Sequence, residues 1–140
     1  MLEAQRLAER SAGIMLAGDQ ASAALGMKLE SVAPGRATVS MRVRADMTNG
    51  HQLCHGGLIA AVADTAFAVA CNSYGEVTVA AGFDLTFLEP ARLGDVLQAR
   101  AVERARRGRS GLYDVTVVRL PETVIAEFRG RSRSLGKPIG

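Results

Sequence analysis

Apolar positions near the N-terminus recur at the spacing of an amphipathic helix. Five small or apolar side chains fall on one face when successive residues are about 100° apart: Leu7, Ala8, Ser11, Ile14 and Met15. The spacing predicts a helix that ends near Leu16 and packs on the outside of the fold. A connection rich in Gly and Ala follows, so residues 1–25 are expected to form an N-terminal helical segment.

From Gly26 onward the period of the apolar positions changes to two. In ATVSMRVR, residues 37–44, apolar and polar side chains alternate, which is typical of a strand with one buried face. The preceding MKLESVAPG, residues 27–35, predicts the hairpin partner of this strand, with Pro34-Gly35 at the turn. Partial alternation predicts four more strands, at residues 77–88, 96–105, 112–120 and 124–132. The connections EPARLGD, RRGRS and LPET are short and rich in Gly, Pro and charge, so antiparallel hairpins are expected between these strands.

One long apolar helix is expected between the second and third strands, over residues 56–74. It is apolar on nearly every side, and a helix of that kind must be covered all round. A single curved sheet covers one side only, so the remaining face needs a second molecule or the N-terminal helix. The order of elements predicts an α+β fold, in which a curved antiparallel β-sheet wraps around a long central α-helix. We expect one domain over residues 1–140, with its core in residues 26–140, assembled as a dimer.

Length and charge narrow the class of protein. At 140 residues the chain suits one hydrophobic core. Its formal charge of +3 comes from 17 basic and 14 acidic residues, a balance that argues against a surface built to coat nucleic acid. The N-terminus lacks the continuous apolar core that a signal peptide requires, and the longest apolar stretch, residues 56–71, is too short to span a bilayer. We therefore expect a cytoplasmic protein with no membrane partner, in which Cys54 and Cys71 are reduced.

The stretch most informative about function is NGHQLCHGGLIAAVADTAFAVACNSYG, residues 49–75. His55-Gly56-Gly57 precedes the helix, so unpaired N–H groups and the positive end of the helix dipole lie where two glycines let a ligand approach. This arrangement predicts an oxyanion site. Asp64 interrupts the apolar run, and burial among Ala and Val would raise its basicity and its reactivity toward an acyl carbon.

Gly57 and Asp64 lie on one face of the expected helix. At a rise of about 1.5 Å per residue they are about 10 Å apart, which is too far for both to act on one carbonyl. The spacing fits a dimer in which the N-terminus of one helix faces the aspartate of the other, so that each active site is shared. A purely structural role, in which Asp64 bonds to a hydroxyl such as that of Thr65, is the alternative.

Two other chemistries have weaker support. His51, Cys54 and His55 cluster closely, but a closed zinc site needs a fourth ligand, and no second ligand pair occurs in the chain. A Cys54 nucleophile with a His55 base is disfavoured, because adjacent side chains point apart and no third group orients the base. We expect neither a metal nor a cofactor.

The stretch 49–75 closely resembles the PaaI-type thioesterases of the hotdog fold, the branch associated with phenylacetic acid degradation. The most specific part runs from Asn49 through His55-Gly56-Gly57 to Ala63-Asp64-Thr65-Ala66, and the order of strands matches over nearly the whole chain. The resemblance implies hydrolysis of an acyl-CoA thioester, with an aryl-acetyl group such as hydroxyphenylacetyl, or a medium-chain group, as the acyl part. We expect the dimers to pair further as a homotetramer.

Roles for individual residues follow from the resemblance. Asp64 matches the nucleophile or general base of the family, and the N–H of Gly56 matches the group that polarises the thioester carbonyl. Asn49 matches a residue that places the thioester or the attacking water, His55 matches one that shapes the turn, and Thr65 could orient a water. A hydratase or dehydratase of the same fold that acts on acyl thioesters, and a non-catalytic acyl-CoA binding protein, are the alternatives.

Further residues are candidates for contact with the substrate. The turn Arg106-Arg107-Gly108-Arg109-Ser110 lies in the densest positive run of the chain and could hold the phosphates of CoA, although a solvated hairpin tip is the alternative. Phe67, three residues after Asp64, is the best candidate for the wall of an acyl pocket. Gly57 is also expected near the substrate. Met41, Phe83 and Phe87 could line the same pocket, although a plain core role is the alternative for all of these apolar residues, Phe67 included.

Overall fold

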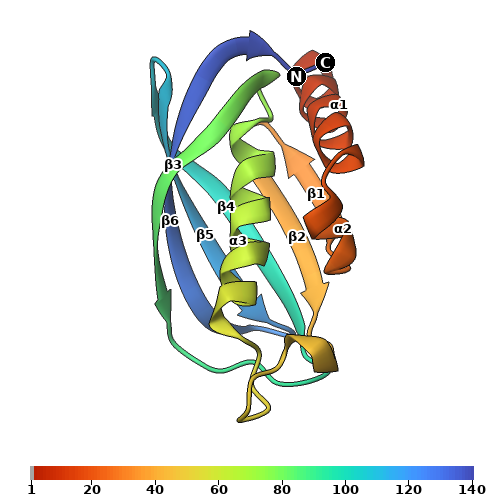
Figure 1. The fold of residues 1–140 in the computed structure, drawn as a ribbon. Coiled ribbons are helices and arrows are strands. Elements are labelled where there is room, and N and C mark those ends of the chain that lie inside the picture. Colours follow the sequence, from red (N-terminus) through yellow and green to blue (C-terminus); the bar gives the residue numbers. More distant parts are fainter. Residues whose placement is uncertain (1) are drawn as a thin grey trace.

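The computed structural model of the chain describes residues 2–140 (Figure 1). Two helices come first, α1 (Leu2–Ala17) and α2 (Gln20–Ala24). A hairpin of β1 (Lys28–Ala33) and β2 (Arg36–Arg42) leads through a 3₁₀-helix, η1 (Ala45–Met47), to the central helix α3 (Gly56–Cys71). Four strands complete the chain: β3 (Glu76–Phe87), β4 (Val96–Arg107), β5 (Ser110–Arg119) and β6 (Thr123–Pro138). No helix within the described residues is long and apolar enough to cross a bilayer.

All the strands form one antiparallel sheet in the order β1-β2-β4-β5-β6-β3. The expected hotdog arrangement is confirmed, because the sheet curves around α3, which lies along its concave face (Figure 1). The hairpins β1–β2, β4–β5 and β5–β6 are also confirmed. The prediction that residues 89–95 close a hairpin is wrong. β4 is paired on both sides, with β2 and β5, so β3 adds to the free side of β6 and the connection crosses the end of the sheet.

The core lies between α3 and the sheet. Phe67 of α3 packs against Tyr113 of β5 and Phe128 of β6, with ring centroids 5.6 Å apart in both pairs. Gly130 makes room for this ring, because a Cβ at that position would lie 2.8 Å from Phe67. The largest side chain of α3 therefore fixes how the helix sits on the sheet.

The N-terminal segment covers a second side of α3 and one edge of the sheet. α1 packs on β1, and the Gln5 side-chain amide donates a hydrogen bond of 2.8 Å to the Val32 carbonyl of that strand. The sequence predicted only a connection after α1, but Asp19 starts a second short helix there. Its carboxylate accepts a hydrogen bond from the Ser22 N–H at 3.0 Å, which caps α2. α2 in turn packs on α3.

A third side of α3 stays uncovered in the single chain. Positions facing the sheet are buried, while the opposite stripe is exposed or half-buried: Gly57, Ala60, Ala61, Asp64 and Ala68. The helix is therefore apolar on a side that neither the sheet nor the N-terminal segment covers.

Candidate active site

The loop before α3 holds the first turn of that helix. His55 is the N-cap residue, with φ −59° and ψ 132°, and its N–H donates to the Met47 carbonyl at 2.8 Å. His55 Nδ1 accepts a hydrogen bond from the Gly57 N–H at 3.4 Å. The Gly56 N–H has no hydrogen-bond acceptor within residues 2–140. It is left for a ligand at the end of the helix where the dipole favours negative charge.

Asn49 organises the same loop. Its side-chain oxygen accepts hydrogen bonds from the N–H groups of His51 at 2.9 Å and Leu53 at 3.2 Å. Gln52 adopts a positive φ of 63° at the tip of the turn, a conformation that few residues other than glycine adopt. The oxygen of Asn49 is used within the loop, so its NH₂ group is the part that can bind a ligand.

An apolar cavity of about 330 Å³ opens beside the Gly56 N–H. Its lining is mainly apolar, from Leu53, Ile59, Phe87, Leu88 and Pro90, with Asn49 and Gly56 at one wall. Phe87 packs closely on the start of α3, because a Cβ on Gly56 would lie 2.9 Å from its ring. An apolar pocket with an unpaired N–H at its wall suits a ligand with an apolar body and a carbonyl oxygen.

Only Phe87 of the expected acyl-pocket residues lines this cavity. Phe67 and Met41 are each 1% exposed and belong to the core. The assignment of Phe67 as a substrate contact is therefore corrected, because α3 presents this ring to the sheet. Phe83 stacks on Phe128, with ring centroids 4.6 Å apart, and lies outside the lining.

Asp64 lies about two turns further along α3, on the uncovered stripe. Burial raises the pKa of its carboxyl group, and the negative charge of Asp19 raises it further. Asp64 is therefore more basic than an exposed carboxylate. At about 1.5 Å per residue it is about 12 Å from Gly56 along the helix axis, so the two groups do not meet within one chain.

The Thr65 hydroxyl bonds to α2 rather than to Asp64. Thr65 Oγ1 lies 2.9 Å from Ser22 Oγ, and the Ser22 hydroxyl donates to Asp19 Oδ2 at 2.7 Å, so Thr65 is the donor to Ser22. The hydroxyl hydrogen of Thr65 is therefore engaged in the bond to Ser22. Thr65 therefore cannot also donate to Asp64. Its oxygen can still accept a hydrogen bond from a water, so the role of Thr65 in orienting a water stays a prediction.

The basic turn lies at the other end of α3. Residues 106–110 are exposed, and all of them except Arg107 border a small cavity together with Cys71, the last residue of the helix (Figure 1). The Arg106 guanidinium stacks on the Tyr74 ring at 3.5 Å from its centroid, and Arg107 Nη1 donates to the Arg106 carbonyl at 3.0 Å. The structure does not bring this turn to the helix start of the same chain.

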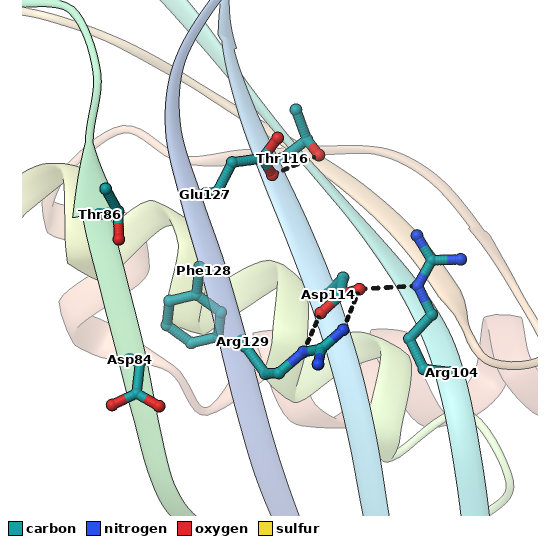
Figure 2. A pocket seen from close by; sticks show the side chains of 8 residues that line it. All are labelled: Asp84, Thr86, Arg104, Asp114, Thr116, Glu127, Phe128 and Arg129. Atoms are coloured by element: carbon teal, nitrogen blue, oxygen red, sulfur yellow. Dashed lines mark hydrogen bonds and ion pairs between the residues drawn. The ribbon is translucent and has the colours of Figure 1, made fainter.

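Another cavity, of about 410 Å³, lies on the face of the sheet away from α3 (Figure 2). Asp114 accepts hydrogen bonds there from Arg129 Nε at 2.6 Å and Arg104 Nε at 2.7 Å. The Arg129 hydrogen bond is the main reason that the pKa of Asp114 is lowered to about 2. Thr116 likewise donates to Glu127 at 2.8 Å. The carboxylates of Asp114 and Glu127 are therefore engaged with neighbouring side chains, whereas Asp84 and Thr86 bind none of the other residues drawn (Figure 2).

The candidate metal and thiol chemistries have no geometric support in the described part of the chain. No cluster of three or more His, Cys, Asp or Glu side chains in residues 2–140 is placed to hold a metal ion. His51 is exposed, whereas Cys54 and Cys71 are free and buried. Burial raises the pKa of both thiols, to about 12 for Cys71. A neutral thiol at position 54 is a poor nucleophile.

Two residues beside the site were missed by sequence reasoning. Asp19 and Ser22 connect α2 to α3 through Thr65. An Asp just before a run of small residues is a recognised helix-start signal and could have revealed α2. Nothing in the local pattern indicates that this helix contacts the residue next to Asp64.

Comparisons with known proteins agree on one family. Residues 51–126 match the model of the thioesterase superfamily, a stretch that includes α3 but neither α1 nor α2. The acyl-coenzyme A thioesterase PaaI of Escherichia coli is 42% identical over 130 residues, which are 93% of each chain. The solved structure of that E. coli protein superposes with a TM-score of 0.95, over 97% of this chain and 99% of the other, at 41% identity. A mutant of the phenylacetic acid degradation protein PaaI from Thermus thermophilus has 38% identity and a TM-score of 0.80, over 84% of this chain and 100% of the other.

Proposed function

Because the chain belongs to the thioesterase superfamily, as a PaaI-type member with the hotdog fold, we propose that Asp64 and the Gly56 N–H carry out its hydrolysis of acyl-CoA. Asp64 serves as the base or nucleophile, and the Gly56 N–H binds the oxyanion. The observation that carries this proposal is the unpaired N–H of Gly56 at the wall of an apolar cavity, at the positive end of α3.

The reaction can follow either of two balanced routes. In the general-base route, Asp64 takes a proton from water as the water oxygen attacks the thioester carbon, and the carbonyl electrons move to the oxygen bound by the Gly56 N–H. Collapse of this intermediate breaks the C–S bond, and the CoA thiolate takes the proton from Asp64. In the nucleophilic route, the carboxylate attacks the same carbon and expels the thiolate, which leaves an anhydride. Water then hydrolyses the anhydride to the free acid, as its carboxylate, and the Asp64 carboxylate; one proton of this water goes to the CoA thiolate and the other to solvent. The raised basicity of Asp64 suits both routes.

The cavity beside Gly56 is the proposed acyl site. Its apolar side chains suit an aryl-acetyl or medium-chain group and leave the carbonyl at the Gly56 N–H. Glu89 also lines the cavity, so its negative charge would disfavour an acyl chain that ends in a free carboxylate. We propose that the NH₂ group of Asn49, which also lines the cavity, binds the substrate or a water.

A second copy of the chain would complete the site. β3 is an edge of the sheet, so a row of its N–H and C=O groups faces no partner strand. It also exposes apolar side chains, namely Val79, Phe83 and Phe87. We propose that two β3 strands pair about a two-fold axis, which joins the sheets edge to edge and places the uncovered stripes of the two α3 helices beside each other. The homotetramer stays a prediction.

Helix and strand dimensions give the position of this axis that a shared site would require. Phe87 packs on Gly56, and Asp64 is about 12 Å further along α3. An axis that crosses β3 near Leu85 lies about 6.6 Å from Phe87, at about 3.3 Å per strand residue. The two-fold symmetry puts Phe87 of the second copy at the same distance on the other side of the axis. With the strand and helix axes taken as parallel, the two helix starts are then about 13 Å apart along α3. The Gly56 N–H of the second copy is thereby level with Asp64.

The same symmetry gives the basic turn a role. Antiparallel pairing of the two β3 strands brings the turn of one copy to the end of the sheet where α3 of the second copy begins. We propose that Arg106, Arg107, Arg109 and Ser110 contact the CoA phosphates there, and that the exposed Gly57 lets the thioester reach the helix start.

Release of free thiol from a panel of acyl-CoA thioesters tests the proposed function. Aryl-acetyl and medium-chain esters should be hydrolysed, and faster than esters of dicarboxylic acids. A changed acyl chain without thiol release would support the hydratase or dehydratase alternative. Tight binding without any turnover would support a non-catalytic binding protein.

Mixing two inactive variants tests whether the site is shared between chains. Subunits carrying Asp64→Asn and subunits carrying Gly56→Pro, allowed to exchange at equal amounts, should recover about a quarter of wild-type activity, because about half of the dimers are mixed and one of the two sites in each is intact. Thiol release after exchange measures the recovery. If both groups act within one chain, every chain lacks one of them and no activity returns.

The basic turn should affect KM for CoA esters. Arg106→Ala with Arg107→Ala is expected to raise KM several-fold at low ionic strength, since an exposed contact to phosphate contributes on the order of 1 kcal/mol. A pantetheine thioester, which lacks the nucleotide, should show no change. Arg36→Ala with Arg42→Ala, which removes the same charge from exposed positions on β2, is the control. An unchanged KM for CoA esters would leave the turn as a solvated hairpin tip.

A further inference from the structure

α2 contacts α3 at the residue next to Asp64, through groups that are fixed in place. The Asp19 carboxylate accepts two hydrogen bonds from Ser22, at 3.0 Å from its N–H and at 2.7 Å from its hydroxyl. Ser22 is 6% exposed, and it accepts the hydrogen bond from Thr65. The end of α2 is also anchored, because Arg44 Nη1 donates to the Ala24 carbonyl at 3.0 Å. The negative charge of Asp19 is therefore held at a defined position beside α3.

The negative charge of Asp19 acts on Asp64 across the α2–α3 contact. The α2–α3 contact borders a cavity of about 80 Å³, and Lys28 of β1 is the one cation among its lining residues. On α3 itself, the group coupled to Asp64 is the buried Cys71 thiol, whose raised pKa keeps it neutral. Asp19 is the charged neighbour that disfavours ionisation of Asp64 and so raises its pKa, after the larger effect of burial.

We propose that Asp19 is a positioning residue for the thioesterase reaction, which holds Thr65 through Ser22 and acts on Asp64 by its charge across the α2–α3 contact. The proposal rests on the proposed function of Asp64. α2 lies outside residues 51–126, the stretch that matches the family model, so this part of the site comes from the N-terminal segment.

Asp19→Asn tests the charge without removing the cap, because Asn is as good an N-cap residue as Asp. Loss of the negative charge makes Asp64 easier to ionise. In a plot of kcat against pH, the acid limb, where kcat falls as Asp64 is protonated, should therefore move to lower pH. On the plateau kcat should fall severalfold because Asp64 becomes a weaker base, while KM stays the same. Glu3→Gln, which removes one negative charge from the exposed start of α1, should leave the limb in place.

Titration of the Asp64 carboxyl by ¹³C NMR gives a readout that does not depend on activity. The Asp64 signal, assigned by its loss in Asp64→Asn, should titrate at lower pH in Asp19→Asn than in wild type and in Glu3→Gln. If the chain hydrolyses no thioester, the function proposed for Asp64 fails, but this titration still decides whether Asp19 acts on it. Asp19→Ser, a second uncharged cap, replaces Asp19→Asn if that variant does not fold. Unchanged Asp64 titration and an unchanged acid limb would overturn the proposal and leave Asp19 as a cap of α2 only.

Discussion

Asp64→Asn should abolish turnover while the protein stays folded. The amide is close in size to the carboxylate but is neither a base nor a useful nucleophile. Loss of a general base typically costs about 10²–10⁴-fold in rate, so kcat should fall by at least about 100-fold. The measurement is thiol release by purified variant and wild type on the same ester. Retention of more than about a tenth of wild-type kcat would reject the catalytic role.

The same variant should be more stable than wild type at neutral pH. The pKa of Asp64 is raised in the folded state, so the folded protein is destabilised where the carboxylate is ionised. The amide removes that cost. The difference in unfolding temperature should therefore be present at neutral pH and should disappear as the pH falls below 3.8, where the carboxyl is protonated in both the folded and the unfolded wild type. A variant that unfolds at a lower temperature at neutral pH would indicate that the Asp64 carboxylate supports packing.

Gly56→Pro should lower kcat by about 10²–10³-fold, the usual effect of losing one oxyanion donor. Proline has no N–H, yet it is well tolerated at the first position of a helix. The preceding His55, at φ −59° and ψ 132°, already has the extended backbone that a following proline requires. The variant should therefore keep α3 and lose the group proposed to bind the oxyanion. Single-turnover thiol release separates this effect from product release.

Gly56→Ala is the matched control for crowding. It keeps the N–H but adds a Cβ that would lie 2.9 Å from the Phe87 ring, so it measures the steric part of the change alone. Phe87 is 52% exposed, and its ring has room to move. The alanine variant should lose much less activity than the proline variant, and mainly through KM. Equal losses in the two variants would show that crowding at Phe87, rather than the missing N–H, is responsible.

The sequence predicted the central helix well, and it indicated candidate residues on this helix, because both depend on local signals. A helix start after His55-Gly56-Gly57 and an Asp in an apolar run can be recognised within one short stretch. The side chains that face the sheet could not be predicted in the same way. α3 is apolar on nearly every side, so its spacing does not distinguish the face of Phe67 from the face of Ala68.

Contacts between distant segments account for the other differences. Alternation identified the strand at residues 77–88, but it carries no information about which strand lies beside it, and β3 pairs with the last strand of the chain. Thr65 is close to Asp64 in sequence, but its hydroxyl is used by Ser22, which comes from a helix that local patterns left as a connection. The tertiary partners decided which groups remained free to act.

α1 also determines how far strand pairing can continue. The sheet has two outer strands, β1 and β3, and α1 lies on β1 with Gln5 bonded to its Val32 carbonyl. Such a shielded edge is a poor template for another chain, whereas the open β3 edge can accept one. In the proposed dimer the two β3 strands pair with each other, so neither leaves an open sheet edge for a third copy. In that dimer, the N-terminal helix would thereby keep strand pairing from continuing past two copies.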